Sequence, residues 1–310
     1  MSLDYFLTVS VFSMINMILA SSLNILIGYA GQVSLGHAAF FGIGAYASAI
    51  LTVKLGMGYW PTLLLSVFIS GLIGLLLGLP ALRVREDFLV LATIGVNFVV
   101  VSVFNYVKFF GGPYGILGLP RPSLFGHAFT TREYALYVFL WTLVVVFLVR
   151  YLSNTYLKLG FDALREDEDA AESVGVSSPR YKMYAFAIAG LLAGLAGNLW
   201  AHYMTVVFPD NFSFPVSIGI LTMVVIGGVG TLVGPLIGAI IVTILPEVLR
   251  FARDYRMLIY GLIIVFTMFF MPKGIVGSIK GLIFGDTPLG KKRVEKVRRI
   301  AGAQGRIAGR

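Results

Sequence analysis

Cysteine is absent from this chain of 310 residues, and charged residues are scarce. The absence of cysteine excludes disulfides, cysteine zinc sites and thiol catalysis. Asp, Glu, Lys and Arg make up 13% of the residues, whereas about 25% is usual in a soluble domain. Apolar residues make up 58%, and the mean hydropathy is +0.88. This composition disfavours a soluble enzyme, excludes intrinsic disorder and favours a protein with many membrane spans.

The charged residues leave long uncharged runs between them. Residues 5–53 form one run of 49 positions, and residues 211–246 form another of 36. A helix needs about 20 apolar residues to cross a hydrocarbon layer of ~30 Å, so each of these runs holds two spans, or a span and a re-entrant piece. The runs lack the alternation of barrel strands. Helices are therefore expected, because they satisfy their own backbone hydrogen bonds in lipid.

We predict an all-α, polytopic helical membrane protein with about 8–10 transmembrane helices. The short linker containing Arg83 and Arg85 is expected in the cytoplasm, by the excess of basic residues there. The Gly/Pro-rich loop 109–132 then lies outside, the polar segment 153–182 lies in the cytoplasm, and the N-terminus lies outside. The predicted spans are 5–27, 33–54, 60–81, 88–108, 133–152, 183–204, 214–229, 232–249 and 257–272.

The positive charge is concentrated at the C-terminus. Residues 280–310 contain nine Lys or Arg and two acids, so +7 of the net +9 lies there. We divide the chain into a transmembrane domain, 1–279, and a basic cytoplasmic tail, 280–310. Two roles remain open for the tail: a solvated segment that obeys the positive-inside rule, or a contact with anionic lipid headgroups. Nucleic-acid binding is discarded, because no aromatic interleaving or motif supports it.

The cytoplasmic segment 157–182 is rich in acids and alanines. Five of the fifteen acids of the chain fall within 166–172. The sequence predicts one short helix over 162–174, which Gly175 ends. Ser178 is a candidate cap for the next helix, and Pro179 suits its first position. Such a helical element can sit in a groove of a cytosolic partner, or it can be an ordinary solvated loop between spans.

A second segment, 22–46, places polar side chains at membrane depth. Asn24, Gln32, Ser34 and His37 would be costly facing lipid, so they are expected to face the bundle interior or a cavity. They are candidates for the translocation pathway, where they could bind a zwitterionic solute or shape a gate. The alternative is hydrogen bonding between helices for packing alone.

A faint internal repeat links the two halves of the chain. Ile27-Gly28-Tyr29-Ala30-Gly31 and Ile226-Gly227-Gly228-Val229-Gly230 each precede a Gly/Ala-rich span. Interrupted helices at matching positions in two halves indicate a transport pathway. Alternatively, glycine is simply common in membrane helices, where it permits close packing.

No motif for chemistry accompanies these segments. The chain has no phosphate-binding loop of the Gly-x-x-x-x-Gly-Lys-Ser/Thr type and no His-Glu-x-x-His. Its three histidines are far apart in sequence. We therefore predict no catalytic residue, no metal site and no cofactor. The uncharged runs also contain no Asp or Glu for coupling to protons or sodium, so a transporter of this kind would need an external motor.

Taken together, these segments resemble the permease subunit of bacterial branched-chain amino acid ABC importers. The resemblance covers about residues 1–280. It is carried by the stretch 22–46, Leu79-Pro80-Ala81-Leu82-Arg83-Val84-Arg85, Gly111-Gly112-Pro113-Tyr114-Gly115-Ile116, Ala163-Leu164-Arg165-Glu166-Asp167-Glu168, Tyr255-Arg256-Met257-Leu258-Ile259-Tyr260-Gly261 and Pro272-Lys273-Gly274.

The resemblance implies a function for the acidic segment. Importer permeases share a cytoplasmic loop with a Glu-Ala-Ala, three residues, Gly pattern, which here falls on Asp169, Ala170, Ala171 and Gly175, with Asp in place of Glu. This implies that the segment, including Arg165 and Glu166, is a coupling helix that docks on an ABC ATPase.

The implied complex contains two cytoplasmic ABC ATPase subunits, a second homologous permease and a periplasmic substrate-binding protein, which would meet the loops 109–132 and 205–215. The expected location is the inner (plasma) membrane. Two alternatives stay open: the same architecture carrying urea or short amides, and an ion-coupled secondary carrier. A non-transporting scaffold or an intramembrane enzyme is a third, weaker possibility.

Overall fold

The computed structural model describes residues 3–81, 86–124, 127–248, 259, 261, 262, 265 and 274–278. The linker of Arg83 and Arg85, most of the predicted span 257–272 and the tail 280–310 lie outside these residues. The helices and strands are α1 Leu3–Asn24, η1 Ile25–Tyr29, α2 His37–Ala49, η2 Ile50–Lys54, α3 Tyr59–Ala81, α4 Glu86–Tyr106, η3 Lys108–Phe110, η4 Gly112–Tyr114, β1 Ile116–Leu117, β2 Ser123–Leu124, β3 His127–Ala128, α5 Thr131–Leu152, α6 Tyr156–Glu166, α7 Glu168–Ser173, α8 Ser178–Met204, β4 Val206–Val207, η5 Pro209–Phe212, α9 Phe214–Gly227 and α10 Gly234–Val248.

The all-α membrane architecture is confirmed. Among the described residues, six helices are long and apolar enough to cross a membrane: α1 with η1, α3, α4, α5, α8 and α9 preceded by η5. Helix α10 is a shorter apolar helix, and α2 with η2 covers residues 37–54 of the predicted span 33–54. Helices thus occupy eight of the nine predicted spans, and the ninth falls mostly outside the described residues.

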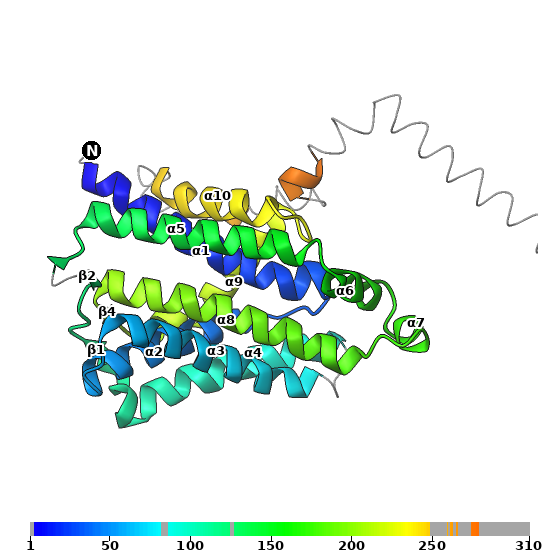
Figure 1. The fold of residues 1–310 in the computed structure, drawn as a ribbon, viewed down its shortest axis with the longest axis horizontal. Coiled ribbons are helices and arrows are strands. Elements are labelled where there is room, and N and C mark those ends of the chain that lie inside the picture. The colour runs from blue at the N-terminus through cyan, green and yellow to red at the C-terminus, as the bar shows by residue number, and fades with distance from the viewer. Residues whose placement is uncertain are drawn as a thin grey trace, which may run out of the picture.

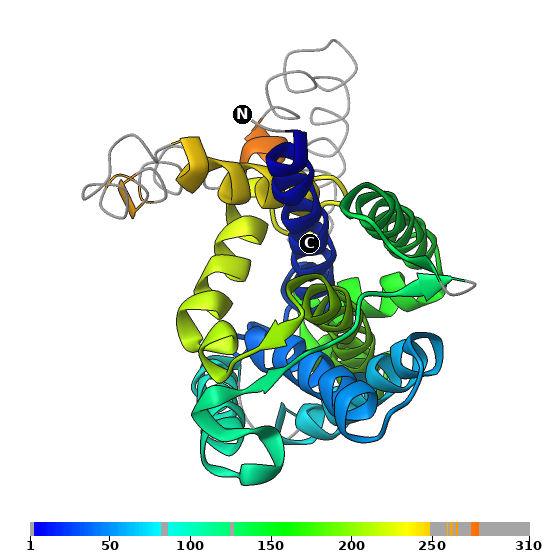
Figure 2. The same cartoon turned by 90° about the vertical axis from the view of Figure 1, so that its left-hand side faces the viewer.

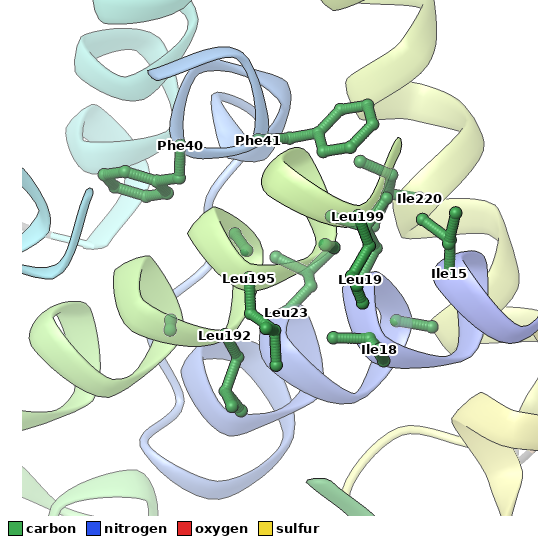
Figure 3. Close-up of a cluster of buried hydrophobic side chains, with 14 of the residues drawn as sticks. Ile15, Ile18, Leu19, Leu23, Phe40, Phe41, Leu192, Leu195, Leu199 and Ile220 are labelled. Atoms are coloured by element: carbon green, nitrogen blue, oxygen red, sulfur yellow. The ribbon is translucent and has the colours of Figure 1, made fainter. Parts of the chain in front are cut away.

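Helix α8 lies inside the bundle, against α1, α2 and α3 (Figure 2). Small residues permit the close approach: a Cβ built on Gly44 of α2 would lie 2.4 Å from the Cα of Gly194 of α8. Without a hydrophobic force between helices in lipid, such close backbone packing supplies much of the attraction. Larger side chains fill the space beside this contact, where isoleucine and leucine of α1 meet leucines of α8 (Figure 3).

The two ends of the bundle differ (Figure 1). One end carries α6 and α7. The other end, which we call the strand end, carries the short strands β1 to β4. Strand β1 pairs with β4 in antiparallel register, Ile116 opposite Val207. A buried His202 ties the same end together: its Nδ1–H donates to the Pro120 carbonyl at 2.7 Å, and its Nε2 lies 2.9 Å from the Ser48 hydroxyl.

Candidate functional site

The predicted coupling loop 157–182 contains two helices rather than one (Figure 1). The single helix predicted over 162–174 is wrong, because α6 ends at Glu166 and α7 begins at Glu168. Asp167 between them is extended (φ −162°), and its carboxylate accepts a hydrogen bond from the Ala170 amide at 3.0 Å. Aspartate favours this break, since its side chain satisfies an amide that has no partner within the new helix.

Gly175 terminates α7, as the sequence predicts. Its φ is +89°, a conformation that other residues adopt at a cost. Its amide donates to the Glu172 carbonyl at 3.0 Å, and the Val176 amide donates to the Ala171 carbonyl at 3.0 Å. This pair of bonds is the Schellman motif that commonly ends a helix at glycine. The Asp-Ala-Ala pattern therefore lies on a short helix, and its glycine forms the turn that follows.

Helix α7 is fixed to the first turns of α8. The cap predicted at Ser178 is wrong by one residue: Ser177 is the N-cap, and Pro179 takes the second helical position. The Ser178 hydroxyl is instead used to donate to the carboxylate of Glu168. Lys182 of α8 lies 2.7 and 2.8 Å from the two oxygens of the same carboxylate.

These contacts change the acidity of Glu168. Burial raises its pKa, but hydrogen bonds from Lys182 and Ser178, with the positive charge of Lys182, outweigh burial and hold the pKa below the usual 4.5. Ala171 is buried on the same side of α7. The predicted site residue Ala171 therefore packs within the protein in the described structure.

The opposite side of α7 is open. Asp169, Ala170 and Glu172 are exposed, and Val174, four residues after Ala170, is 77% exposed. Residues four apart lie on the same helical face. Glu166, at the end of α6, is also exposed. We call this surface the α7 knob: Ala170 and Val174 as a small apolar spot, bordered by the acids Glu166, Asp169 and Glu172.

Asn24, the first pathway candidate, joins the two halves of the predicted repeat. Its side-chain oxygen accepts a hydrogen bond from the Gly230 amide at 2.8 Å, and its Nδ2 donates to the Thr231 carbonyl at 3.0 Å. At this point a Cβ on Gly28 would lie 2.5 Å from the Gly230 nitrogen. The glycine segments 27–31 and 226–230, about two hundred residues apart in sequence, are therefore in direct backbone contact.

The other three candidates are buried near the start of α2. His37 Nε2 lies 3.0 Å from the hydroxyl of Ser22, which itself donates to the Ala189 carbonyl at 2.7 Å. The hydroxyl's hydrogen is thus already committed, so Nε2–H is the donor to Ser22. Within the described part of the chain, the side chains of Gln32 and Ser34 make only long hydrogen bonds of 3.4 Å, to the Ala30 carbonyl and from the Gly36 amide. Among the described residues, no hydrogen bond joins Gln32, Ser34 or His37 to Asn24, and solute contact by these four residues stays a prediction.

Sequence reasoning missed the residues that bond to the pathway candidates or to their neighbours in the chain. Ser22, Thr93, Ser217 and Thr231 are hydroxyl residues inside uncharged runs: Thr93 accepts from the Leu35 amide at 3.1 Å, and Ser217 accepts from the Ala38 amide at 3.0 Å. Hydroxyl residues are many in this chain, so no pattern distinguishes those that join helices from the rest. Among the described residues, no group of three His, Asp or Glu could hold a metal ion.

A cavity of 350 Å³ lies between α1, α2, α8, α9 and α10 and is not lined by the four pathway candidates. Phe41 and Trp200 form an aromatic wall, and Asn16, Thr243 and Glu247 provide polar groups. Asn16 donates to the Thr243 hydroxyl at 2.9 Å, and the Tyr5 hydroxyl donates to Glu247. This mixture of aromatic and polar lining suits a solute with both an apolar and a polar end.

Comparison with known proteins agrees with this architecture. A family model described as "Branched-chain amino acid transport system / permease component" matches residues 5–268. The chain belongs to this family. It is accordingly a membrane permease component, a multi-pass protein of the inner membrane.

Individual relatives within the family are similar over most of their length. The permease protein LivM of the high-affinity branched-chain amino acid transport system is 34% identical in both Salmonella typhimurium and Escherichia coli, over 86% of this chain and 69% of the relative. LivH of the corresponding system in Escherichia coli is 26% identical, over 81% of this chain and 87% of the relative. No solved structure matches the chain.

Proposed function

We propose that this permease is a transmembrane subunit of an ATP-driven ABC importer for branched-chain amino acids of the leucine, isoleucine and valine type. It passes the solute from a periplasmic binding protein to the cytoplasm, together with a second homologous permease. Two cytoplasmic ABC ATPases drive the cycle, and the coupling loop 157–182 docks on an ATPase. The chain itself supplies the pathway and carries no ATPase site.

The α7 knob is the observation that carries the proposal. A solvated linker between spans has no reason to be braced, yet here Glu168, Ser178 and Lys182 bind α7 to α8. Because α7 is attached to α8 in the folded state, a displacement of Ala170 or Val174 by a partner also displaces the helix bundle. A flexible loop would move without displacing the bundle. The exposed acids bordering the knob suit a basic rim around an apolar pocket in the partner.

The strand end supports contact with a binding protein. Residues of the two loops predicted to meet it, 109–132 and 205–215, are joined by the pairing of β1 with β4. Pairing across these segments, with His202 holding the Pro120 carbonyl, makes one fixed surface from two loops. A preformed surface loses less conformational freedom on docking than two separate loops would.

The function is tested by reconstitution of the complete complex in vesicles that contain ATP, with the loaded binding protein outside. We expect uptake of labelled leucine, isoleucine and valine that stops when the ATPases carry an inactivating substitution in their phosphate loops. Transport of urea or acetamide in preference to these amino acids would refute the substrate class. Uptake that persists with inactive ATPases and follows a proton gradient would refute ATP coupling.

Docking at the knob is tested by Ala170→Trp. Ala170 is exposed on α7, so the larger ring leaves the permease fold intact but obstructs a partner groove. We expect loss of ATPase co-purification. Ala128→Trp, at an exposed site of the strand end, is the matched control and retains the ATPase. Normal ATPase capture by Ala170→Trp would exclude docking at the knob.

A further inference from the structure

The two glycine segments of the repeat meet at one point, directly beside the coupling loop. We call this point the glycine junction: Gly28, Gly230 and the bridging Asn24. A Cβ on Gly28 would lie 2.5 Å from the Gly230 nitrogen and 2.8 Å from its Cα, distances that only glycine at position 28 permits. Each glycine segment leads from one helix into the next, α1 into α2 and α9 into α10. A shift at the junction therefore moves two helix pairs together.

Arg165, near the end of α6, reaches into this junction. Its Nη1 donates to the Gly28 carbonyl at 2.6 Å, and a Cβ on Gly230 would lie 2.9 Å from the same nitrogen. The side chain therefore rests on both glycine segments at once. A Cβ on Gly31 would in turn lie 3.2 Å from the Arg165 Cα, so the backbone of α6 is also in close contact with the first segment.

The first turn of α6 makes a second contact with the same segment. Lys158 Nζ lies 4.7 Å from the centre of the Tyr29 ring, within the range of a cation–π interaction. Lys158 also pairs with Asp162 one turn later. Helix α6 is thus attached to segment 27–31 at both of its ends, through Lys158 and through Arg165.

The chemistry of the junction favours a cation at this position. Gly28 lies in the last turn of η1, where carbonyl groups lack partners within the helix and carry partial negative charge. An arginine there supplies several donors in a fixed fork, whereas lysine supplies a point charge on a flexible stem. A single residue, Asp167, separates α6 from α7. Because so short a connection allows little independent movement of the two helices, a displacement of the knob also displaces Arg165.

We propose that Arg165 is a positioning residue that transmits movement of the α7 knob to the glycine junction and so couples ATP turnover to rearrangement of the pathway. This inference rests on the proposed function, since it requires a motor at the knob. Arg165 then differs from Ala170 in role, although both lie in the coupling loop. Ala170 meets the partner, while Arg165, although exposed over part of its surface, contacts the Gly28 carbonyl through Nη1 and carries the displacement onward.

The test compares Arg165→Ala, Arg165→Lys and Arg180→Ala in the reconstituted complex. Arg180 is an exposed arginine of the same loop, and its side chain makes no hydrogen bond to the described residues, so it is the matched control. The readouts are ATPase capture, basal ATP hydrolysis measured without the binding protein, and solute transported per ATP. Only the last of these reports transmission.

We expect Arg165→Ala to capture the ATPase and hydrolyse ATP as wild type does, but to transport about five-fold less solute per ATP, the lower end of typical coupling between sites. Arg165→Lys restores part of the ratio, and Arg180→Ala leaves it unchanged. An unchanged ratio in Arg165→Ala overturns the inference, and so does a parallel loss of ATPase capture, which would make Arg165 a docking residue. Failure of the wild-type complex to transport with ATP would instead refute the proposed function.

A second measurement does not depend on turnover. Because the native chain contains no cysteine, spin labels can be attached at Val229→Cys and Leu55→Cys, which are 37% and 64% exposed and lie near the junction and the strand end. Trapping the ATPases with nucleotide is expected to change the distance between the labels. Arg165→Ala, or Arg165→Lys if the alanine variant does not fold, is expected to abolish or reduce the change. A full-sized change in the variant overturns the inference.

Discussion

Gly28→Ala adds a single methyl group to the glycine junction. The new carbon would lie 2.2 Å from the Asn24 side-chain oxygen, 2.5 Å from the Gly230 nitrogen and 2.8 Å from its Cα. Two of these three atoms belong to backbone, which cannot rotate away as the end of a flexible side chain can. The substitution therefore has to separate the two glycine segments and displace the Asn24 side chain, which makes two hydrogen bonds to residues 230 and 231.

The size of the effect follows from comparison with a glycine that has free space. At Gly95 of α4 nothing lies within 4 Å of an added Cβ, so Gly95→Ala gains only the helix preference of alanine, up to about 1 kcal/mol. Gly28→Ala incurs an overpacking cost of about 1–3 kcal/mol. Loss of the two Asn24 hydrogen bonds adds ~0.6 kcal/mol for each. We expect Gly28→Ala to be about 2–4 kcal/mol less stable than wild type, and so about 2–5 kcal/mol less stable than Gly95→Ala.

The assay is unfolding of the two purified variants side by side in the same detergent or nanodisc, with uptake measured in parallel. Gly95→Ala is expected to unfold at or above the wild-type midpoint. Gly28→Ala is expected to unfold earlier and to lose uptake. Equal midpoints for the two variants would refute the close contact between Gly28 and Gly230, and with it the junction.

Two further predictions concern Asn24 and Glu168. Asn24→Leu leaves the Gly230 amide and the Thr231 carbonyl without partners, which costs about 1–3 kcal/mol in unfolding measurements and lowers uptake. The control Asn105→Leu removes only a bond to a carbonyl four residues earlier in its own helix, and equal losses for the two variants would contradict the bridging role. The lowered pKa of Glu168 makes the attachment of α7 to α8 fully present above the usual value of 4.5, and the attachment is lost as pH falls through the lower, folded-state pKa. Amide exchange of α7 should accelerate over that acid range in wild type, and the acceleration should be smaller in Glu168→Gln, where the Asp167 cap and the other acids of α7 remain, after correction for intrinsic exchange. Identical profiles would refute the assignment.

Part of the site was predictable because local rules govern it. Gly175 marks a helix end in sequence, since few other residues tolerate its φ of +89°. The break at Asp167 was missed, although aspartate followed by two acids is a common helix start. Local rules also could not show which side of α7 is covered, so Ala171 and Ala170 are equivalent in sequence but buried and exposed in the fold.

The amino-acid sequence by itself determined that the chain is a bundle of membrane helices. The uncharged runs are long enough for a helix to cross the hydrocarbon layer of a bilayer. In lipid, a helix pairs all of its own backbone groups, so helices are the expected structure. It also located the two glycine segments and the acidic loop. Only the tertiary structure decided that these three meet, because contact between residues 28, 165 and 230 depends on how the helices pack. In the sequence, nothing distinguishes Arg165 from the other charged residues of the cytoplasmic loop. The fold places its side chain against the Gly28 carbonyl.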